Sequence, residues 1–318
     1  PTPPADHHVH IRSEASSKAL ATLQQALSGR EMEPPPATEA DDIITLLDSA
    51  GIEHASLLSL AYFFGIPDVE FENEYRKVRS ENDYVIAQAE RYPERLMAFC
   101  SVQPLADYAV REIERCAETE SVSGLKLHLA NSGVDLRNSA QLDSLRTVFE
   151  AANRLDLPVV VHLFTRNPEY GRRDIRLFVD SILAHVPDLT VQIAHLGAAG
   201  VFDATTDTVV AAFEDRIEAR PDLFDEDVVF DVAATVLDPA RIRAQGDTAR
   251  ADSVRVINAE LADHLLALGP QRVVFGTDWI GGARRPPDYV DLFRTLPLEE
   301  NELHTLLENA APYVSVSG

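Results

Sequence analysis

The sequence predicts a (β/α)8 barrel of the TIM-barrel class, formed by one domain over residues 1–318. Short apolar runs, typical of strands covered on both faces, recur eight times, and helical patterns separate them. The length of 318 residues suits one large barrel. A doubly wound open sheet is the alternative, but no glycine-rich fingerprint follows the first run.

The expected strands share a continuous apolar character, and they lie at residues 6–11, 54–60, 96–102, 125–129, 158–163, 191–196, 228–233 and 273–278. The expected helices show apolar positions at helical spacing, at residues 38–51, 71–91, 106–117, 139–154, 173–186, 207–219, 287–296 and 299–311, with a long helical stretch ending near residue 268. Thr38 is the predicted N-cap of the first of these helices, and Gly51 ends it.

The first strand is followed by a long connection, at about residues 12–36, that contains a short helical pattern at 18–27. An insertion placed directly after a site-bearing strand is typical of a lid or pocket wall. A disordered arm is the other interpretation.

The formal net charge of −24 argues against a nucleic-acid backbone or an anionic membrane surface as a partner. No apolar run approaches the length of a membrane span. We therefore expect a soluble protein that acts on a small molecule, and a homo-oligomer stays open. Residues 1–5 are expected to form a tail, which a removed signal peptide could have left. The compartment, cytoplasmic or exported, stays open. Cys100 and Cys116 show no metal or redox spacing and are expected to be buried small side chains.

The stretch Asp6-His7-His8-Val9-His10-Ile11 carries the strongest indication of chemistry. In an extended strand the two-residue spacing puts His8 and His10 on one face. Two neutral imidazoles that converge from one strand form half of a divalent-metal site. Alone, the pair is a weak indication of a metal site, and a polar strand end near the terminus is the simpler interpretation.

Later strands end in further polar residues, namely Lys126, His128, His162, His195 and Asp278. Functional groups of such a barrel lie at the C-terminal ends of the strands. One buried histidine is usually a hydrogen-bonded core residue, but core packing alone does not explain several such residues at strand ends.

These residues also carry a resemblance to the amidohydrolase superfamily. The matching segments are His8-Val9-His10, Val-Val-Val-His162-Leu, Gln-Ile-Ala-His195-Leu-Gly and Phe-Gly-Thr-Asp278-Trp, and the chain is most similar to the amidohydrolase-related branch. The resemblance implies a barrel with one or two divalent metals, zinc being the preferred ion. It implies that His8, His10 and Asp278 hold the first metal, and that His162 holds the first or second. His195 would hold a second metal or orient the substrate, and Asp278 would also accept a proton from the attacking water.

Lys126 lies inside an apolar run, where burial lowers the pKa of an amine. The resemblance implies that a carboxylated Lys126 could bridge two metals. An unmodified lysine that binds a substrate carboxylate is the alternative. His128, Arg12 and Arg166 follow or end site-bearing strands and are the predicted substrate-binding residues.

The leading functional hypothesis is a metal-dependent hydrolase that cleaves an amide, ester or lactone of a small molecule. A metal-dependent non-oxidative decarboxylase of a small carboxylic acid is the alternative, and it needs no carboxylated lysine. A non-catalytic binding protein on a barrel scaffold is the third hypothesis, and the intact set of candidate ligands argues against it.

Overall fold

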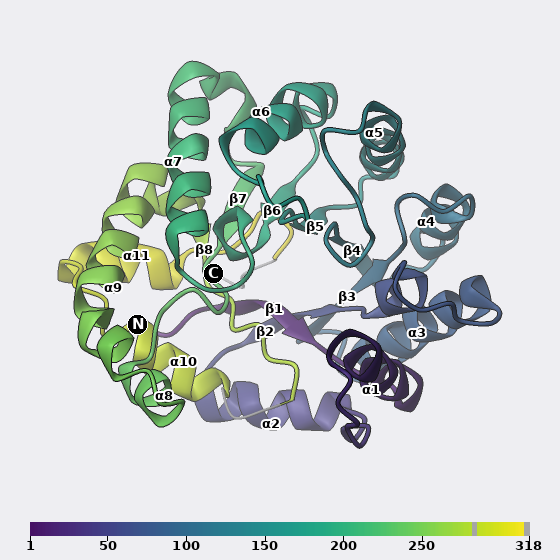
Figure 1. Cartoon of the computed structure of the whole chain (residues 1–318), viewed down its shortest axis with the longest axis horizontal. Helices are drawn as coiled ribbons and strands as arrows, with labels where there is room; N and C mark the ends of the chain where they lie inside the picture. The colour runs from purple at the N-terminus through teal and green to yellow at the C-terminus, as the bar shows by residue number, and fades with distance from the viewer. Residues whose placement is uncertain (282–284, 315–318) are drawn as a thin grey trace.

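The protein, described by a computed structural model over residues 1–281 and 285–314, is built around eight parallel strands. They pair in chain order, and they are β1 (Ala5–His10), β2 (His54–Leu58), β3 (Leu96–Ser101), β4 (Val122–His128), β5 (Val159–His162), β6 (Val191–Ile193), β7 (Val228–Asp231) and β8 (Val273–Val274). Beyond β8, the backbone N–H of His10 donates to Trp279 and that of Asp278 donates to His8, both at 2.8 Å. These bonds join the last strand to the first, so the predicted (β/α)8 barrel is confirmed (Figure 1).

Helices alternate with the strands and surround the barrel (Figure 1). The α-helices are α1 (Glu14–Ser28), α2 (Ala40–Ala50), α3 (Glu74–Ala89), α4 (Ala109–Ala117), α5 (Ser139–Arg154), α6 (Arg172–Ser181), α7 (Ala204–Ala219), α8 (Pro239–Ala244), α9 (Thr248–Leu268), α10 (Pro286–Phe293) and α11 (Glu300–Glu308). Short 3-10 helices are η1 (Ala61–Gly65), η2 (Leu183–His185), η3 (Ala194–Gly197), η4 (Pro221–Leu223) and η5 (Pro270–Arg272).

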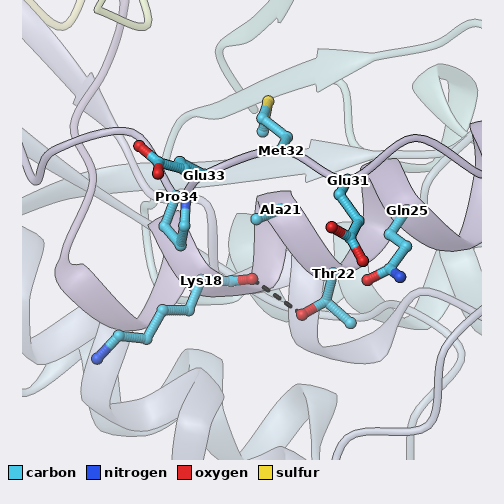
Figure 2. A pocket seen from close by; sticks show the side chains of 8 residues that line it. All are labelled: Lys18, Ala21, Thr22, Gln25, Glu31, Met32, Glu33 and Pro34. Carbon is cyan, nitrogen blue, oxygen red and sulfur yellow. Dashed lines mark hydrogen bonds between the residues drawn. The ribbon is translucent and has the colours of Figure 1, made fainter.

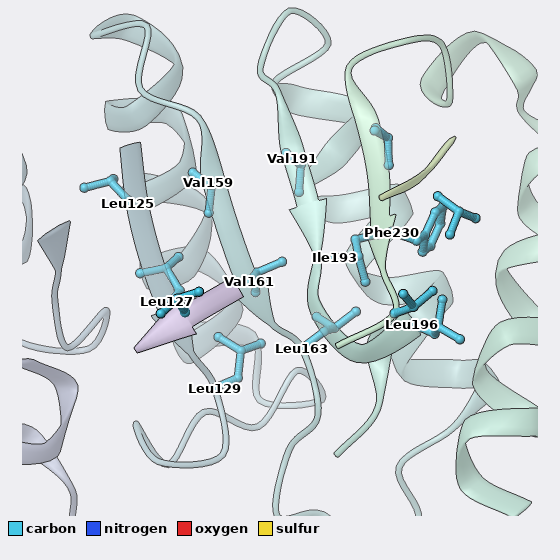
Figure 3. Packing of buried hydrophobic residues seen from close by; sticks show 14 of the residues in the cluster. Leu125, Leu127, Leu129, Val159, Val161, Leu163, Val191, Ile193, Leu196 and Phe230 are labelled. Carbon is cyan, nitrogen blue, oxygen red and sulfur yellow. The ribbon is translucent and has the colours of Figure 1, made fainter. Parts of the chain in front are cut away.

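The main core lies between the outer face of the barrel and the helices. Alternate strand residues point outward into it, including Leu125 and Leu127 of β4 and Val159 and Val161 of β5 (Figure 3). The residues between them point inward, as the two-residue period of a strand requires. This alternation places Lys126 and His128 of β4 inside the barrel. Their partners on β5, Val160 and His162, point inward too.

The barrel interior changes character along its axis. A small apolar cluster that includes Leu58, Phe99 and Val160 fills the lower part, and Tyr313 packs against it with its ring centroid 5.2 Å from that of Phe99. The polar residues lie at the C-terminal ends of the strands, above this plug. Gln192 of β6 pairs in register with Val160 and adds a polar side chain to this layer, since it donates to Asp231 and accepts from Tyr313.

The structure corrects three details of the expectation. Thr38 is not the helix cap, because Glu39 occupies the N-cap position of α2 and the Thr38 hydroxyl accepts a hydrogen bond from the backbone of Arg12. Cys100 and Cys116 are buried as expected, but they form a disulfide between β3 and α4. The strands that lead to His195 and Asp278 end earlier than expected, at Ile193 and Val274, and a 3-10 helix follows β6 from Ala194.

No helix within residues 1–281 and 285–314 is both long and apolar enough to cross a membrane.

Candidate metal centre

Three side-chain atoms from β1 and the segment after β8 converge inside the barrel mouth. The Nε2 atoms of His8 and His10 lie 3.3 Å apart, and Asp278 Oδ1 lies 3.5 Å and 3.4 Å from them. Donors that surround one ion tetrahedrally at about 2.0–2.1 Å are separated by roughly this distance. Both histidines are buried, whereas the Asp278 side chain is 32% exposed and faces the opening.

The other ring nitrogen of each imidazole is held by a hydrogen-bond acceptor. His8 Nδ1 donates to Asp231 Oδ2 at 2.9 Å, and His10 Nδ1 donates to the carbonyl of Leu58 at 3.1 Å. His195 Nδ1 donates to the carbonyl of Ala233 at 2.7 Å. Because these acceptors need a proton on Nδ1, each Nε2 keeps a free lone pair, the arrangement of metal-binding histidines.

The charges of the cluster also suit a cation. Burial lowers the pKa of His8 to about 3 and also lowers that of His10, so both imidazoles are neutral at pH 7. Burial acts to raise the pKa of Asp278, but the neighbouring imidazoles of His10, His195 and His8 lower it to well below 3.8. Two neutral nitrogens and one carboxylate therefore face each other, and this donor set fits a divalent metal.

Asp231 is a functional residue that the sequence reasoning missed. Its Oδ2 accepts from His8 and from Gln192 Nε2 at 2.7 Å, and its Oδ1 accepts from the backbone of His195 and Ala233 at 2.9 and 3.1 Å. His8, His195 and Asp231 could also surround an ion by distance. The four donors, however, already occupy the lone pairs of the carboxylate, so we interpret Asp231 as the support of His8 and His195. Its position at the end of the apolar run Val228–Asp231 was a usable indication.

Lys126 is fully buried, and its Nζ lies 3.3 Å from His8 Nε2. Within the described residues its ammonium has no carboxylate partner at salt-bridge distance. Burial lowers the pKa of Lys126 to about 8, although the charges of Asp231 and Asp278 oppose the shift. The structure thus brings the predicted lysine into the donor cluster.

The histidines of β4 to β6 form a second group beside the donor triangle. The rings of His128 and His162 stack with centroids 3.9 Å apart, and those of His162 and His195 lie 5.0 Å apart. The His195 ring lies 4.6 Å from that of His8. All the predicted histidines therefore meet in one mouth.

The backbone is strained where it delivers two of these residues. His195 and Asp278 adopt left-handed conformations, with φ of 54° and 56°. Such strain in residues other than glycine is characteristic of functional sites. Beside them, a Cβ on Gly276 would lie 2.9 Å from His8 Cβ, so glycine allows β1 and the segment after β8 to approach this closely.

The two predicted arginines are engaged elsewhere. The Arg12 guanidinium donates to the carbonyls of Ile280 and Pro36, tying the insertion to the segment after β8. Arg166 forms an ion pair with Asp68 at 2.5 Å. Neither contact involves the donor triangle.

The insertion also lines a groove to which the donor triangle contributes no residue. A groove of about 640 Å³ separates α1 from residues 31–34 (Figure 2). Lys18, Thr22 and Glu31 are among its lining residues, and Thr22 donates to the carbonyl of Lys18 at 3.0 Å.

Comparisons with known proteins agree with this fold. A comparison with curated proteins found no match. The structure is similar to 5-carboxyvanillate decarboxylase from Sphingomonas paucimobilis, at 15% identity over 96% of each chain and a TM-score of 0.65. It is also similar to a probable 2-pyrone-4,6-dicarboxylic acid hydrolase from Acinetobacter baumannii, at 16% identity over 97% of each chain and a TM-score of 0.58.

A third similar structure is a dihydroxybenzoic acid decarboxylase from a Polaromonas species with bound manganese, at 16% identity, with 97% of this chain and 95% of that chain covered and a TM-score of 0.59. Likeness at these identities shows the fold. The sequence itself matches the model of the amidohydrolase family over residues 5–311. Because this match spans nearly the whole chain, the protein belongs to the amidohydrolase family, as its resemblance implied.

Proposed function

We propose that this protein is a metal-dependent hydrolase that cleaves an amide, ester or lactone bond of a small molecule. The observation that carries the proposal is the dual position of Asp278. Its carboxylate lies 3.4–3.5 Å from both Nε2 atoms, yet a third of the side chain remains exposed to the mouth. One group can therefore serve both as a ligand and as a base for a water in the mouth.

His8, His10 and Asp278 would hold the ion, with zinc as the preferred metal. When bound, the ion would polarise the scissile carbonyl and lower the pKa of a water molecule. Asp278 is ionised at neutral pH, so it accepts the proton of the attacking water and returns it to the leaving group. His195, whose tautomer is fixed by Ala233, presents Nε2 to the substrate or to a second ion.

Lys126 has a separate place in the proposal. Since its pKa is about 8, a fraction of the buried amine is neutral at pH 7 and can react with carbon dioxide. A carboxylated Lys126 beside His8 would then supply the bridge for a second ion. An unmodified amine would instead hold an oxygen of the substrate.

Decarboxylation of a small carboxylic acid is the second candidate, and His195 favours it. Its free Nε2 lies in the mouth beside His8 and His162, where a protonated imidazole could deliver a proton to the carbon that loses carbon dioxide. This reaction uses the same donor triangle without a base for water.

The experiment is a substrate screen with metal-loaded protein. The enzyme is incubated with lactones, N-acyl amino acids, aryl esters and carboxylated aromatics. Two products are measured, namely the new carboxylic acid formed by hydrolysis and carbon dioxide. The proposal expects the new carboxylic acid and no carbon dioxide. Carbon dioxide release from the carboxylated aromatics alone would replace hydrolysis with the second candidate.

A further inference from the structure

The C-terminal segment is attached to the end of the barrel opposite the mouth. Ala311 packs in one apolar cluster with Ala5, the first residue of β1. The backbone N–H of Ala311 also donates to His7 Nε2 at 3.0 Å. The side-chain amide of Asn309 donates to the carbonyl of Val273, where β8 begins, at 2.8 Å. These contacts hold the segment against the N-terminal ends of the strands.

From this segment Tyr313 extends its ring into the barrel. The ring meets those of Phe99 and His7 edge-on, with centroids 5.2 and 6.1 Å away. The Tyr313 hydroxyl donates to Gln192 Oε1. Burial raises the pKa of Tyr313 well above its usual value of 10.0, so the phenol keeps its proton and acts as a donor. The end of the chain thus reaches an inward-facing polar side chain of β6.

Gln192 lies between Tyr313 and the carboxylate that supports the metal centre. Its side chain is fully buried, and its Nε2 donates to Asp231 Oδ2 at 2.7 Å and to the carbonyl of His7 at 3.1 Å. Its Oε1 accepts from Tyr313. Because the nitrogen faces two acceptors and the oxygen faces a donor, the amide has one favourable orientation.

A chain of hydrogen bonds therefore crosses the barrel interior along its axis. It runs from Tyr313 through Gln192 to Asp231, and Asp231 Oδ2 accepts from His8 Nδ1 at 2.9 Å. Gln192, Asp231 and His8 are fully buried, so water does not compete for their bonds. Loss of the phenol would leave Gln192 Oε1 unpaired, and an amide that turned over to compensate would point its oxygen at the Asp231 carboxylate.

We infer that Tyr313 and Gln192 are positioning residues of the metal centre, because they hold Asp231 in the orientation that supports His8. Asp231 also accepts from the backbone of His195 at 2.9 Å, so its placement affects two of the converging histidines. The C-terminal segment thus contributes to metal affinity from the opposite end of the barrel. This inference rests on the metal site of the proposed function and is independent of the reaction.

Metal affinity in single and double variants tests the inference. Tyr313→Phe removes the hydroxyl and keeps the ring, and Gln192→Leu keeps a similar volume without a donor or an acceptor. Metal-stripped protein is titrated with zinc in competition with a chelator. Cobalt(II) is used separately as a coloured probe whose absorption spectrum reports the geometry of its ligands.

Tyr108→Phe is the matched control. Tyr108 is also a buried phenol with a hydrogen-bond acceptor, Glu74, but it belongs to the apolar cluster of α1, η1 and α3. Thermal unfolding checks that each variant is folded. If Gln192→Leu does not fold, Asp231→Asn replaces it as the background for Tyr313→Phe.

We expect Tyr313→Phe to weaken zinc binding by about 2- to 10-fold, the range for one hydrogen bond between neutral groups, and to change the cobalt(II) spectrum. Gln192→Leu should weaken zinc binding by about 10- to 100-fold, as the loss of a supporting partner does. The double variant should bind zinc as Gln192→Leu does, because the hydroxyl acts through that residue. Tyr108→Phe should keep the affinity and the spectrum of the parent.

Parent-like zinc affinity and an unchanged cobalt(II) spectrum in Tyr313→Phe would overturn the inference and leave the metal centre intact. Losses that multiply in the double variant would also overturn it, because Tyr313 would then not act through Gln192. A parent that binds neither ion would reject the metal centre and the inference together. Zinc binding that depends on Tyr313 in a protein that hydrolyses nothing would reject the proposed reaction and keep the inference.

Discussion

The two sides of the barrel mouth hold their polar groups in different ways. On the side of β1, β6 and β8, the histidines His8, His10 and His195 each donate Nδ1 to a fixed acceptor. On the side of η1, β4 and β5, the ring nitrogens of His162 and the hydroxyl of Tyr62 have no partner in the described residues. Lys126 lies between the two sides, and His8 is its only hydrogen-bond partner within the described residues.

This difference assigns separate tasks to the two sides. Locked tautomers and a strained backbone keep ligand atoms in place before an ion arrives, so binding needs little reorganisation. Polar groups left open cost free energy in the empty protein, and that cost is offset when a ligand satisfies them. We therefore propose that the first side holds the metal and that the second binds the substrate.

The first prediction concerns Asp278, the proposed proton acceptor on the locked side. Asp278→Asn keeps one oxygen ligand but cannot accept a proton, so we expect metal content to be retained and kcat to fall by roughly 10²- to 10⁴-fold. The Asp278 side chain does not cap the following turn, because the Trp279 backbone donates to Thr277 instead. Steady-state kinetics on a substrate from the screen, with Asp291→Asn as an exposed control, gives the answer. Near-normal kcat in Asp278→Asn would remove Asp278 from the chemistry.

The second prediction concerns the support of the locked side. Asp231→Asn leaves the acceptor of His8 uncharged, and we expect metal affinity to fall about 10- to 100-fold. Competition with a chelator measures this affinity. Asp174→Asn is the matched control, since Asp174 is equally buried but pairs with Arg137 outside the mouth. If both variants lose metal equally, a general loss of stability explains the effect and the special role of Asp231 fails.

The third prediction concerns the free energy of unfolding that the protein loses by burying Lys126. Its pKa is 10.5 as a free side chain and about 8 in the folded protein. Above pH 10.5 the side chain is neutral in both the folded and the unfolded state, so its titration costs no stability. As pH falls from 10.5 through 8, the unfolded state takes up the proton first, and the folded state is destabilised relative to it. Lys126→Met carries no proton, so in metal-stripped protein it should be more stable than the parent by up to about 3 kcal/mol at pH 7.

Denaturant unfolding of the two metal-stripped proteins at a series of pH values tests this cost. The gain should shrink as the pH approaches 10.5. A gain that is constant with pH would mean that the charge of Lys126 is not the cause. In metal-loaded protein the same substitution should remove one of two metal equivalents if Lys126 is the carboxylated bridge, and none if it is not.

The fourth prediction concerns the close contact of Gly276, just after β8, with His8 of β1. Gly276→Ala would force its Cβ to within 2.9 Å of His8 Cβ, so we expect a loss of at least about 1 kcal/mol in unfolding free energy. Gly171→Ala is the control, because its backbone is extended and its added Cβ would meet only ordinary contacts at 3.7 Å. A stable Gly276→Ala protein with normal metal affinity would show that this approach tolerates a methyl group.

The sequence allowed the barrel and most of the locked side to be predicted. Strand ends of a parallel barrel meet at one face, so His8, His10, His195 and Asp278 had to converge once the alternation was recognised. The two-residue spacing of His8 and His10 also fixed their common face.

The remaining features depend on tertiary contacts that no local pattern encodes. Asp231 acts across the barrel on β1, 223 positions away in the chain, and Tyr62 is placed by packing against α1 and α3. Arg12, which stays a predicted substrate-binding residue, donates to the carbonyls of Ile280 and Pro36, contacts that only the tertiary fold creates. The pairing of Cys100 with Cys116 needs the contact of α4 with β3, which their spacing alone does not reveal.

The most direct measurement of the central claim is the metal content of the purified protein. Elemental analysis of protein prepared without chelator should find about one or two equivalents of a divalent transition metal, zinc above all, and His8→Ala should lose it. Less than about half an equivalent in the parent, with no activation when zinc, manganese or iron is added, would contradict the assignment of His8, His10 and Asp278 as a metal centre.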